Sequence, residues 1–534
     1  MHVTRPSNGD LVAGVSVAMV AIPQSLAYAE LAGMPAQYGL FASALPPLLA
    51  AIFVSSRYLQ TGPVALTALL SFGALSGLAE PASSEYIALA ALLALMVGIM
   101  RTLFGLVRMG SVAYLLSEPV LLGFTTGAAI LITASQLPRM FDLDPDGRNL
   151  ERAAIALTSP GDWSWTAIGF AVMAAVVIVG GRRIHKLFPG VLVAVAAGVL
   201  LSAISGYSGS TVGELEGGFI SLRVDFPWAA VPDLLIPALA IALVGFAEPA
   251  SIARTFAAEE RELWDANREM VSQGVANLAS GVSGAFPVGG SFSRSSLNRL
   301  AGATSPWSGA ITGLIVLLAL PLTPVIADLP SAILGAIVIV AVFKLINVGD
   351  LIALVRQSRA QSMVAVGTLV ATLATAPRVE QGVLIGIGLA LAVHLYRELV
   401  VRSDVVRTGG TVTLSFHGVL WFASVPSLDI QVRQAVADRE GLERLVVDLG
   451  GVGRMDYSGA SSMLRIATEL ESAGIDVVLV RIPPGATRAV RAKLAEIGSP
   501  HTATPIGSEP RPDEPQPSDS GTDRDGSGAG ATAR

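Results

Sequence analysis

A polar, helix-breaking stretch from Phe286 to Leu297 interrupts a chain that is otherwise dominated by long apolar segments. Its sequence, FPVGGSFSRSSL, contains a proline, two adjacent glycines, four serines and Arg294. Irregular backbone is tolerated at membrane depth only where it is buried in protein or lines a cavity. An arginine inside a membrane is costly, so its default interpretation is a functional site. The stretch therefore predicts a half-helix whose N-terminus helps to hold an anion inside a transporter.

The composition places most of the chain in lipid. Of its 534 residues, 52% are hydrophobic and 14% are charged, whereas soluble domains carry about 25% charged residues. The net charge of −6 gives no indication of a nucleic-acid partner. Cysteine is absent, which excludes disulfides and thiolate chemistry, and the five histidines lack the spacing of a zinc site. We therefore expect no metal and no cofactor, and we see no signal-peptide cleavage pattern near the N-terminus.

Apolar segments follow one another from Leu11 to about Arg402, separated by short polar loops or by glycine and proline. Two segments, Thr61–Leu70 and Phe286–Leu297, are too short and broken to cross a hydrocarbon layer of about 30 Å alone. Counting both, we predict an α-helical polytopic membrane protein with fourteen transmembrane elements, preceded by a cytoplasmic lead over residues 1–10. The full spans are expected near 11–29, 36–54, 85–104, 113–135, 163–180, 188–206, 233–254, 268–285, 306–325, 330–346, 360–376 and 380–400.

Basic residues indicate the orientation of these segments, because cytoplasmic loops carry an excess of Lys and Arg. If the N-terminus is cytoplasmic, the inside loops are basic and the outside loops are acidic or mixed. This pattern predicts a multi-pass protein of the inner or plasma membrane with both termini in the cytoplasm. The basic residues assigned to inside loops are Arg57, Arg101, Arg108, Arg182, Arg183, Lys186, Arg254, Arg261, Arg268, Lys344, Arg356 and Arg359.

The two broken segments occupy the third and tenth places, which are equivalent if the membrane domain consists of two repeats of seven. Because seven is odd, such repeats would be inverted in the membrane. Paired interrupted segments at corresponding positions are the best sequence pointer to a transporter's binding site. The alternative is two unrelated Gly/Pro kinks.

The composition changes after the membrane domain, which we assign to residues 11–402. Residues 411–499 alternate short apolar runs with amphipathic ones, which indicates a small soluble α/β domain. From His501 onward Pro, Ser, Gly and Asp dominate, so residues 500–534 are predicted to be a disordered tail.

Three motifs resemble those of the sulfate permease (SulP) family. They are PQSLAYAELAGMPAQYGLFASALPPLL from Pro23, SSRYLQTGPVALTALLS from Ser55, and FPVGGSFSRSSLNRLAGATSPWSG from Phe286. The C-terminal domain resembles a STAS domain, including DYSG at Asp456–Gly459. The resemblance implies a fold like that of uracil permeases, with 7+7 inverted repeats split into core and gate domains. It also implies an anion transporter that is usually a homodimer.

The helix N-termini at the two breaks are the predicted anion site, because each presents unpaired N–H groups and about half a positive charge. The resemblance places the first end at Val64 and Ala65, and the second at Ser291, Phe292 and Ser293. The simpler interpretation is that these serines only cap and pack a membrane helix, where serine is a common helix contact.

Arg294 and Glu248 are the predicted charged pair of the site. A cation in a low-dielectric interior needs a partner, and the candidates are the substrate and Glu248. This glutamate lies deep in the span near 233–254, the eighth of the fourteen predicted elements. We expect Glu248 to load and release a proton, and the resemblance agrees, because proton-coupled members of the family have a glutamate in this segment. The resemblance also implies an Asp at this place in sodium-linked bicarbonate members, and no Asp lies beside Glu248, which favours proton over sodium coupling. The alternative is that the two residues form a fixed structural pair.

Two residues of the first segment and one of the C-terminal domain complete the candidates. Gln24 and Tyr28 are four residues apart, hence on one helical face, and the resemblance places both at the anion cavity. Glu30, just beyond them, is expected to meet the outer headgroups. In the STAS-like domain, Ser458 is a possible regulatory phosphosite, although Asp456 and Ser458 also fit a helix start.

The predicted function is a secondary active transporter of an inorganic oxyanion, with proton-coupled sulfate uptake by alternating access as the first choice. Bicarbonate, chloride or dicarboxylate transport or exchange is the alternative within the family. An anion sensor that signals through the STAS-like domain is the alternative from another class. We expect no enzyme, because no catalytic constellation of side chains occurs in the sequence.

Overall fold

The computed structural model describes residues 5–111, 117–213, 218–437, 441–483 and 486–497, and the predicted tail lies outside them. The chain divides into two compact units, Met1–Val393 and His394–Arg534, and the division falls within helix α16 (Val379–Leu399). Each unit has a hydrophobic core of its own.

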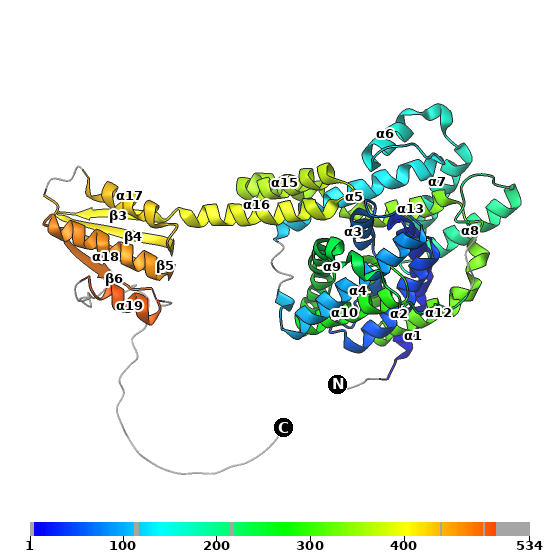
Figure 1. Cartoon of the computed structure of the whole chain (residues 1–534), viewed down its shortest axis with the longest axis horizontal. Helices are drawn as coiled ribbons and strands as arrows, with labels where there is room; N and C mark the ends of the chain where they lie inside the picture. Colours follow the sequence, from blue (N-terminus) through cyan, green and yellow to red (C-terminus); the bar gives the residue numbers. More distant parts are fainter. Residues whose placement is uncertain (1–4, 112–116, 214–217, 438–440, 484–485, 498–534) are drawn as a thin grey trace, which may run out of the picture. The chain divides into compact units, whose positions relative to one another are not determined.

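The first unit is a bundle of helices (Figure 1), which confirms the predicted polytopic helical class. A helix lies at each predicted segment, and two short amphipathic helices, α6 and α14, were not predicted because they are not apolar enough. The 3₁₀ segments are Pro160–Asp162, Trp228–Ala230, Leu320–Ile326 and Phe343–Leu345. Besides α16, the helices are α1 (Asn8–Leu31), α2 (Gln37–Phe53), α3 (Ala65–Leu75), α4 (Ser84–Leu106), α5 (Glu118–Phe141), α6 (Asn149–Thr158), α7 (Trp165–Ile184), α8 (Gly190–Ser205), α9 (Val231–Glu260), α10 (Ala266–Val282), α11 (Phe292–Leu300), α12 (Trp307–Ala319), α13 (Ser331–Val342), α14 (Val348–Gln357) and α15 (Arg359–Thr375).

Eight helical segments in the described part of the chain are long and apolar enough to cross a membrane by themselves. The other elements are shorter, such as α2, α3 and α8, or more polar, such as α10. In a membrane, these shorter or more polar helices need to pack against neighbouring helices. The eight segments are Asn8–Leu31, Ser84–Leu106, Glu118–Phe141, Trp165–Ile184, Trp228–Glu260, Trp307–Ile326, Ser331–Gln357 and Val379–Leu399.

Arg101 does not lie in a loop, contrary to the prediction. We assigned it to a cytoplasmic loop, but it lies inside α4 with 0% of its surface exposed. Its guanidinium donates to three backbone carbonyls of other segments, those of Ile241, Ala242 and Val288. Arg101 is therefore a buried cation of the bundle, and it contributes nothing to the loop charge that orients the chain.

The two broken segments meet inside the bundle. Strand β1 (Thr61–Gly62) pairs antiparallel with strand β2 (Gly289–Gly290), and Thr61 lies opposite Gly290. Helix α3 begins shortly after β1, at Ala65, and helix α11 begins shortly after β2, at Phe292. This pairing disfavours two unrelated kinks and satisfies backbone groups that would otherwise be unpaired at membrane depth.

Gly290 allows this pairing to form against helix α9. A Cβ atom at position 290 would lie 2.7 Å from the Cβ of Pro249 and 2.8 Å from Cδ1 of Leu59. A side chain there would push the strand away from the helix that carries Glu248. Because glycine has no side chain, the backbone at position 290 can lie directly against Pro249 of α9.

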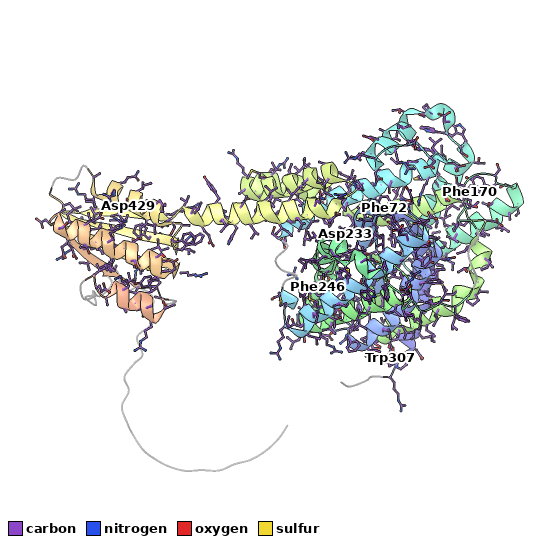
Figure 2. All side chains as sticks on the ribbon, viewed as in Figure 1. Phe72, Phe170, Asp233, Phe246, Trp307 and Asp429 are labelled. Atoms are coloured by element: carbon purple, nitrogen blue, oxygen red, sulfur yellow. The ribbon has the colours of Figure 1, made fainter. Side chains whose placement is uncertain are left out.

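Helix α10 braces the strand pair with a row of buried polar side chains. The side chain of Asn277 accepts from the N–H of Val288 at 2.9 Å and donates to the carbonyl of Val288 at 3.0 Å. One turn earlier, Gln273 donates to the hydroxyl of Thr61 at 2.8 Å. Each of these side chains provides a hydrogen-bond partner for a buried polar atom of a broken segment. Figure 2 shows Phe246 of α9, which packs with Met270 of α10.

In its described residues, the second unit contains a four-stranded mixed sheet and, after α16, the helices α17, α18 and α19. The strand order is β3-β4-β5-β6, with β3 antiparallel to β4 and the other pairs parallel. Strand β3 extends the expected domain, which we began at residue 411. The elements are β3 (Arg402–Thr408), β4 (Thr411–Leu420), α17 (Val425–Val436), β5 (Arg444–Met455), α18 (Tyr457–Ser472), β6 (Asp476–Val480) and α19 (Arg488–Leu494).

A buried carboxylate on strand β5 stabilises this sheet. Asp448 is 5% exposed and accepts hydrogen bonds from Nε and Nη2 of Arg481, from the hydroxyl of Ser415 and from the N–H of Gly450. Burial alone would raise the pKa of Asp448, but the hydrogen bonds and the charge of Arg481 outweigh it and lower the pKa below its ordinary value. Because its folded-state pKa is depressed, its stabilising effect is present above the unfolded pKa of about 4 and is lost as the pH falls through the folded pKa.

Replacing Asn277 by Leu should destabilise the membrane unit by about 1–3 kcal/mol, because the buried N–H of Val288 loses its partner, whereas the carbonyl of Val288 keeps its hydrogen bond from Arg101. The measurement is thermal unfolding of the full chain in detergent. Ser283→Ala is the control, since Ser283 is equally buried and bonds only to Ser280 of its own chain segment. Equal melting temperatures for Asn277→Leu and Ser283→Ala would contradict the bracing role.

Replacing Asp448 by Asn should weaken the sheet at pH 7 by about 1–3 kcal/mol, because the charged partner of Arg481 is removed. Hydrogen exchange of the β5 amides, compared between wild type and variant at each pH, measures this local stability. The difference should shrink as the pH falls below about 4. A difference that stays constant between pH 7 and pH 3 would show that charge is not the cause.

Candidate functional site

A cavity of about 420 Å³ lies where the two half-helices begin, and its described lining includes residues of helices α1, α3, α7, α8, α9, α11 and α13. Nine candidate residues of the membrane unit were predicted, and eight of them line the cavity. Those eight are Gln24, Tyr28, Val64, Ala65, Glu248, Ser291, Phe292 and Ser293.

The N-terminus of α3 presents its backbone N–H groups without a side-chain cap. Val64 has extended backbone at the cap position, and its own side chain cannot accept a hydrogen bond. The first N–H groups of a helix have no partner within the helix. At Val64 and Ala65 they are therefore free donors at the cavity wall, with the positive end of the helix dipole behind them.

The N-terminus of α11 is capped by the side chain of Ser291. The hydroxyl of Ser291 accepts from the N–H of Arg294 at 3.4 Å, and the hydroxyls of Ser291 and Ser293 are 3.3 Å apart. Phe292 is 56% exposed, although it lies inside the bundle, because its ring faces the cavity. The capping interpretation of Ser291 is thus correct, and Ser291 and Ser293 also line the cavity.

Gln24 and Tyr28 reach the cavity from one face of α1. Both are buried, and Oε1 of Gln24 has no hydrogen-bond partner among the described residues. A buried amide without a partner is costly, and rotation of the amide would present its N–H groups instead. An unpaired polar group that faces a cavity is suited to a polar ligand.

Glu248 lines the cavity, whereas Arg294 lies behind its wall. Nη2 of Arg294 donates to the carbonyl of Pro63 at 2.7 Å, and the guanidinium packs against Gly62. Within the described residues no ion pair of 4.0 Å or less joins Glu248 to Arg294, but the two charges are close enough to interact. Nε of Arg294 has no described partner. The arginine therefore retains a free donor.

Three cations line one end of the cavity, and no sequence motif indicates that they border the site. Arg182, Lys186 and Lys344 contribute to its wall, and we had assigned all three to cytoplasmic loops. Arg182 and Lys186 also line an adjoining hollow at the end of α7. The cavity therefore extends toward the end of the bundle where these three basic residues lie.

At the other end of α1, Glu30 forms an ion pair with Arg139 of α5 at 2.6 Å. We expected Glu30 to meet lipid headgroups, but its carboxylate is largely shielded within the protein. Arg139 was not predicted as its partner because the contact joins segments that are far apart in sequence.

Two supporting residues could have been found from sequence. Gln273 and Asn277 are four residues apart in an apolar segment, a spacing that places both on one helical face. Polar residues repeated at that interval predict a buried partner. Which backbone they hold, at Thr61 and Val288, follows only from the tertiary structure.

Ser458 is exposed at the start of α18, where Asp456 is the N-cap and accepts from the N–H of Gly459 at 2.7 Å. The structure thus supports a helix-start role for Asp456. Phosphorylation of Ser458 stays a prediction. No cluster of His, Asp and Glu suited to a metal ion occurs among the residues that the structure describes.

Comparison with known proteins agrees with this architecture. Residues 8–368 match the sulfate permease family, and residues 402–500 match the STAS domain. A probable sulfate transporter of Mycobacterium tuberculosis is 30% identical, covering 92% of this chain and 93% of the relative. A chloroplastic sulfate transporter of Arabidopsis thaliana is 29% identical, covering 88% of this chain and 74% of the relative.

Solved structures share the fold. The anion transporter SLC26A9 aligns with a TM-score of 0.82 at 20% identity, covering 91% of this chain and 86% of that one. The transmembrane domain of BicA, a cyanobacterial bicarbonate transporter, aligns with a TM-score of 0.62 at 22% identity, covering 72% of this chain and 97% of that domain. The chain is a multi-pass membrane protein that belongs to the sulfate permease family and carries a C-terminal STAS domain.

Proposed function

We propose that this protein is a secondary active transporter that carries sulfate inward together with protons. The observation that supports this most is the convergence of two half-helix N-termini, α3 and α11, on one cavity. Two positive helix ends and free N–H groups bind an oxyanion without a large number of cations.

Sulfate is the proposed substrate because relatives that match over nearly the whole chain are named sulfate transporters. The lining supports a hydrogen-bonding oxyanion, since Gln24, Tyr28, Ser291 and Ser293 can all donate. A tetrahedral dianion accepts from several directions at once. Bicarbonate, chloride or a dicarboxylate is the alternative substrate, and a sensor that binds an anion without transporting it is the alternative class.

Glu248 is the proposed proton-coupling residue. It lines the cavity and has no hydrogen-bond or ion-pair partner among the described residues, so it is not locked as a structural carboxylate. When ionised, Glu248 would attract Arg294 and repel an entering anion. Protonation would remove that repulsion and leave Arg294 free to face the anion, which links occupancy by the proton and the anion.

Alternating access is the proposed mode of transport, with core and gate helices moving around a fixed site. The cavity reaches the cations Arg182, Lys186 and Lys344, whereas Glu30 and Arg139 join α1 to α5 and are not among its described lining residues. This arrangement supports an inward-facing state if the basic end is cytoplasmic. We propose the inner or plasma membrane, with both termini in the cytoplasm, and a homodimer as in the family.

Glu248→Gln should abolish sulfate accumulation driven by an inward proton gradient, because glutamine mimics the protonated carboxyl and cannot release a proton. Labelled sulfate uptake into proteoliposomes, with and without a pH gradient, is the measurement. Sulfate exchange at equal pH should persist. Glu85→Gln, an exposed carboxylate in the first turn of α4, is the control. Accumulation by Glu248→Gln at the wild-type level would refute the coupling role, and binding without any flux in wild type would favour the sensor.

Arg294→Ala should weaken sulfate binding by about 10- to 100-fold, the loss of one charge-assisted hydrogen bond. Arg294→Lys should recover part of the affinity, because it keeps the charge. Binding of labelled sulfate to the purified protein measures this. Arg299→Ala is the matched control on the same helix, since Arg299 pairs with Glu259 and Glu260 near the surface. Unchanged affinity in Arg294→Ala would exclude contact with the substrate.

A further inference from the structure

Arg101 is a buried cation that the proposed transport cycle does not use. Its guanidinium donates to the carbonyls of Ala242 at 3.0 Å and Ile241 at 2.8 Å on α9. It also donates to the carbonyl of Val288, next to strand β2, at 3.1 Å. In the described part of the chain no carboxylate lies within ion-pair distance of it. Three neutral carbonyls satisfy the donors but leave the charge uncompensated.

The position of Arg101 is directly behind the anion site. A Cβ atom at Gly245 would lie 2.5 Å from Nη2 of Arg101 and 3.2 Å from the methyl group of Thr67. Thr67 is in the first turn of α3, two residues after Ala65 of the cavity wall. Gly245 is one turn before Glu248 on α9. The absence of a side chain at Gly245 therefore makes room for a cation between the two elements that form the site.

Three other buried carboxylates in the described membrane unit lie in the first turns of their helices and do not neutralise this charge. Asp10 of α1 accepts from Thr304 and Ser305. Glu269 of α10 accepts from the N–H groups of Ser55 and Ser56. Glu380 is in the first turn of α16. Beside the two half-helix N-termini, the charged groups are the guanidinium groups of Arg101 and Arg294 and the carboxyl of Glu248, whereas the cations Arg182, Lys186 and Lys344 line the basic end of the cavity.

We propose that Arg101 is a positioning residue whose fixed charge makes the site select a dianion over a monoanion of the same shape. This proposal rests on the proposed function as an anion transporter. An uncompensated charge at such depth is expensive, and it is compensated when an anion occupies the neighbouring site. With Glu248 protonated, the charges of Arg101 and Arg294 behind the half-helix ends attract a dianion more strongly than a monoanion. With Glu248 ionised, its negative charge offsets one of these two positive charges.

The size of the effect follows from the charge of the ligand. Val288, which holds Arg101, is three residues from Ser291, so extended backbone separates them by about 10 Å. At an effective dielectric constant of about 20, one charge at that distance changes binding of a monoanion by about tenfold. For a dianion the same charge counts twice, so the change is about a hundredfold.

Sulfate and perchlorate provide the test, because both are tetrahedral oxyanions and they differ by one charge. Arg101→Gln should weaken sulfate binding about a hundredfold and perchlorate binding about tenfold, so the sulfate-to-perchlorate preference falls about tenfold. Arg101→Lys keeps the charge and should keep the preference within about threefold, even if it lowers stability. Binding is measured on the full purified chain by displacement of labelled sulfate, with Arg356→Gln, an exposed cation of α14, as the control.

Equal fold-changes for both anions in Arg101→Gln would overturn the proposal, because only a structural role weakens them alike. If Arg101→Gln does not fold, Arg101→Lys still decides, since loss of the preference there would also overturn it. Failure of the transport proposal is a separate result. In that case the wild-type chain would bind sulfate with the expected preference and give no uptake into proteoliposomes. Uptake by wild type with an unchanged preference in Arg101→Gln would refute the role of Arg101 alone.

Discussion

The antiparallel pairing of Thr61–Gly62 with Gly289–Gly290 is the interaction on which the rest of this membrane unit depends. Extended backbone at membrane depth is stable only if protein satisfies its N–H and C=O groups. Here the two broken segments satisfy each other. Because both helices start just after this pairing, their N-termini open on the same cavity, and the site exists as a consequence of the pairing.

The surrounding helices are adapted to this interruption. Asn277 of α10 occupies both polar groups of Val288, and Gln273 reaches Thr61. Gly290 lets the strand approach Pro249 of α9. Arg101 of α4 ties the segment before β2 to α9 through backbone carbonyls. Each contact joins elements that are far apart in sequence, so helices α4, α9 and α10 together hold the backbone beside the cavity in place.

Much of the architecture could be predicted from sequence because its physical cause is local. Hydropathy predicted a helix near each long apolar segment, and the Gly/Pro breaks at Gly62–Pro63 and Gly289–Gly290 placed the half-helices. The amphipathic helices α6 and α14 were missed, since a short helix with one polar face lacks an apolar run. Arg101 was wrongly assigned to a loop, because loop and buried arginines near the end of an apolar run have the same sequence signature. Glu30 was misplaced for a similar reason, since its partner Arg139 is distant in the chain.

The sequence by itself determined the class of molecule: a polytopic membrane domain with two interrupted helices, followed by a STAS domain. Composition and periodicity carry that information, because they report whether a segment is solvated by lipid or by water. Only the tertiary structure decided which residues face the cavity. It brought Gln24, Glu248 and Ser291 to one wall, turned Arg294 toward Pro63, and placed Arg101 behind the site. These are relations between distant segments, and they follow from packing, in which the nearest neighbours of a side chain are seldom its neighbours in sequence.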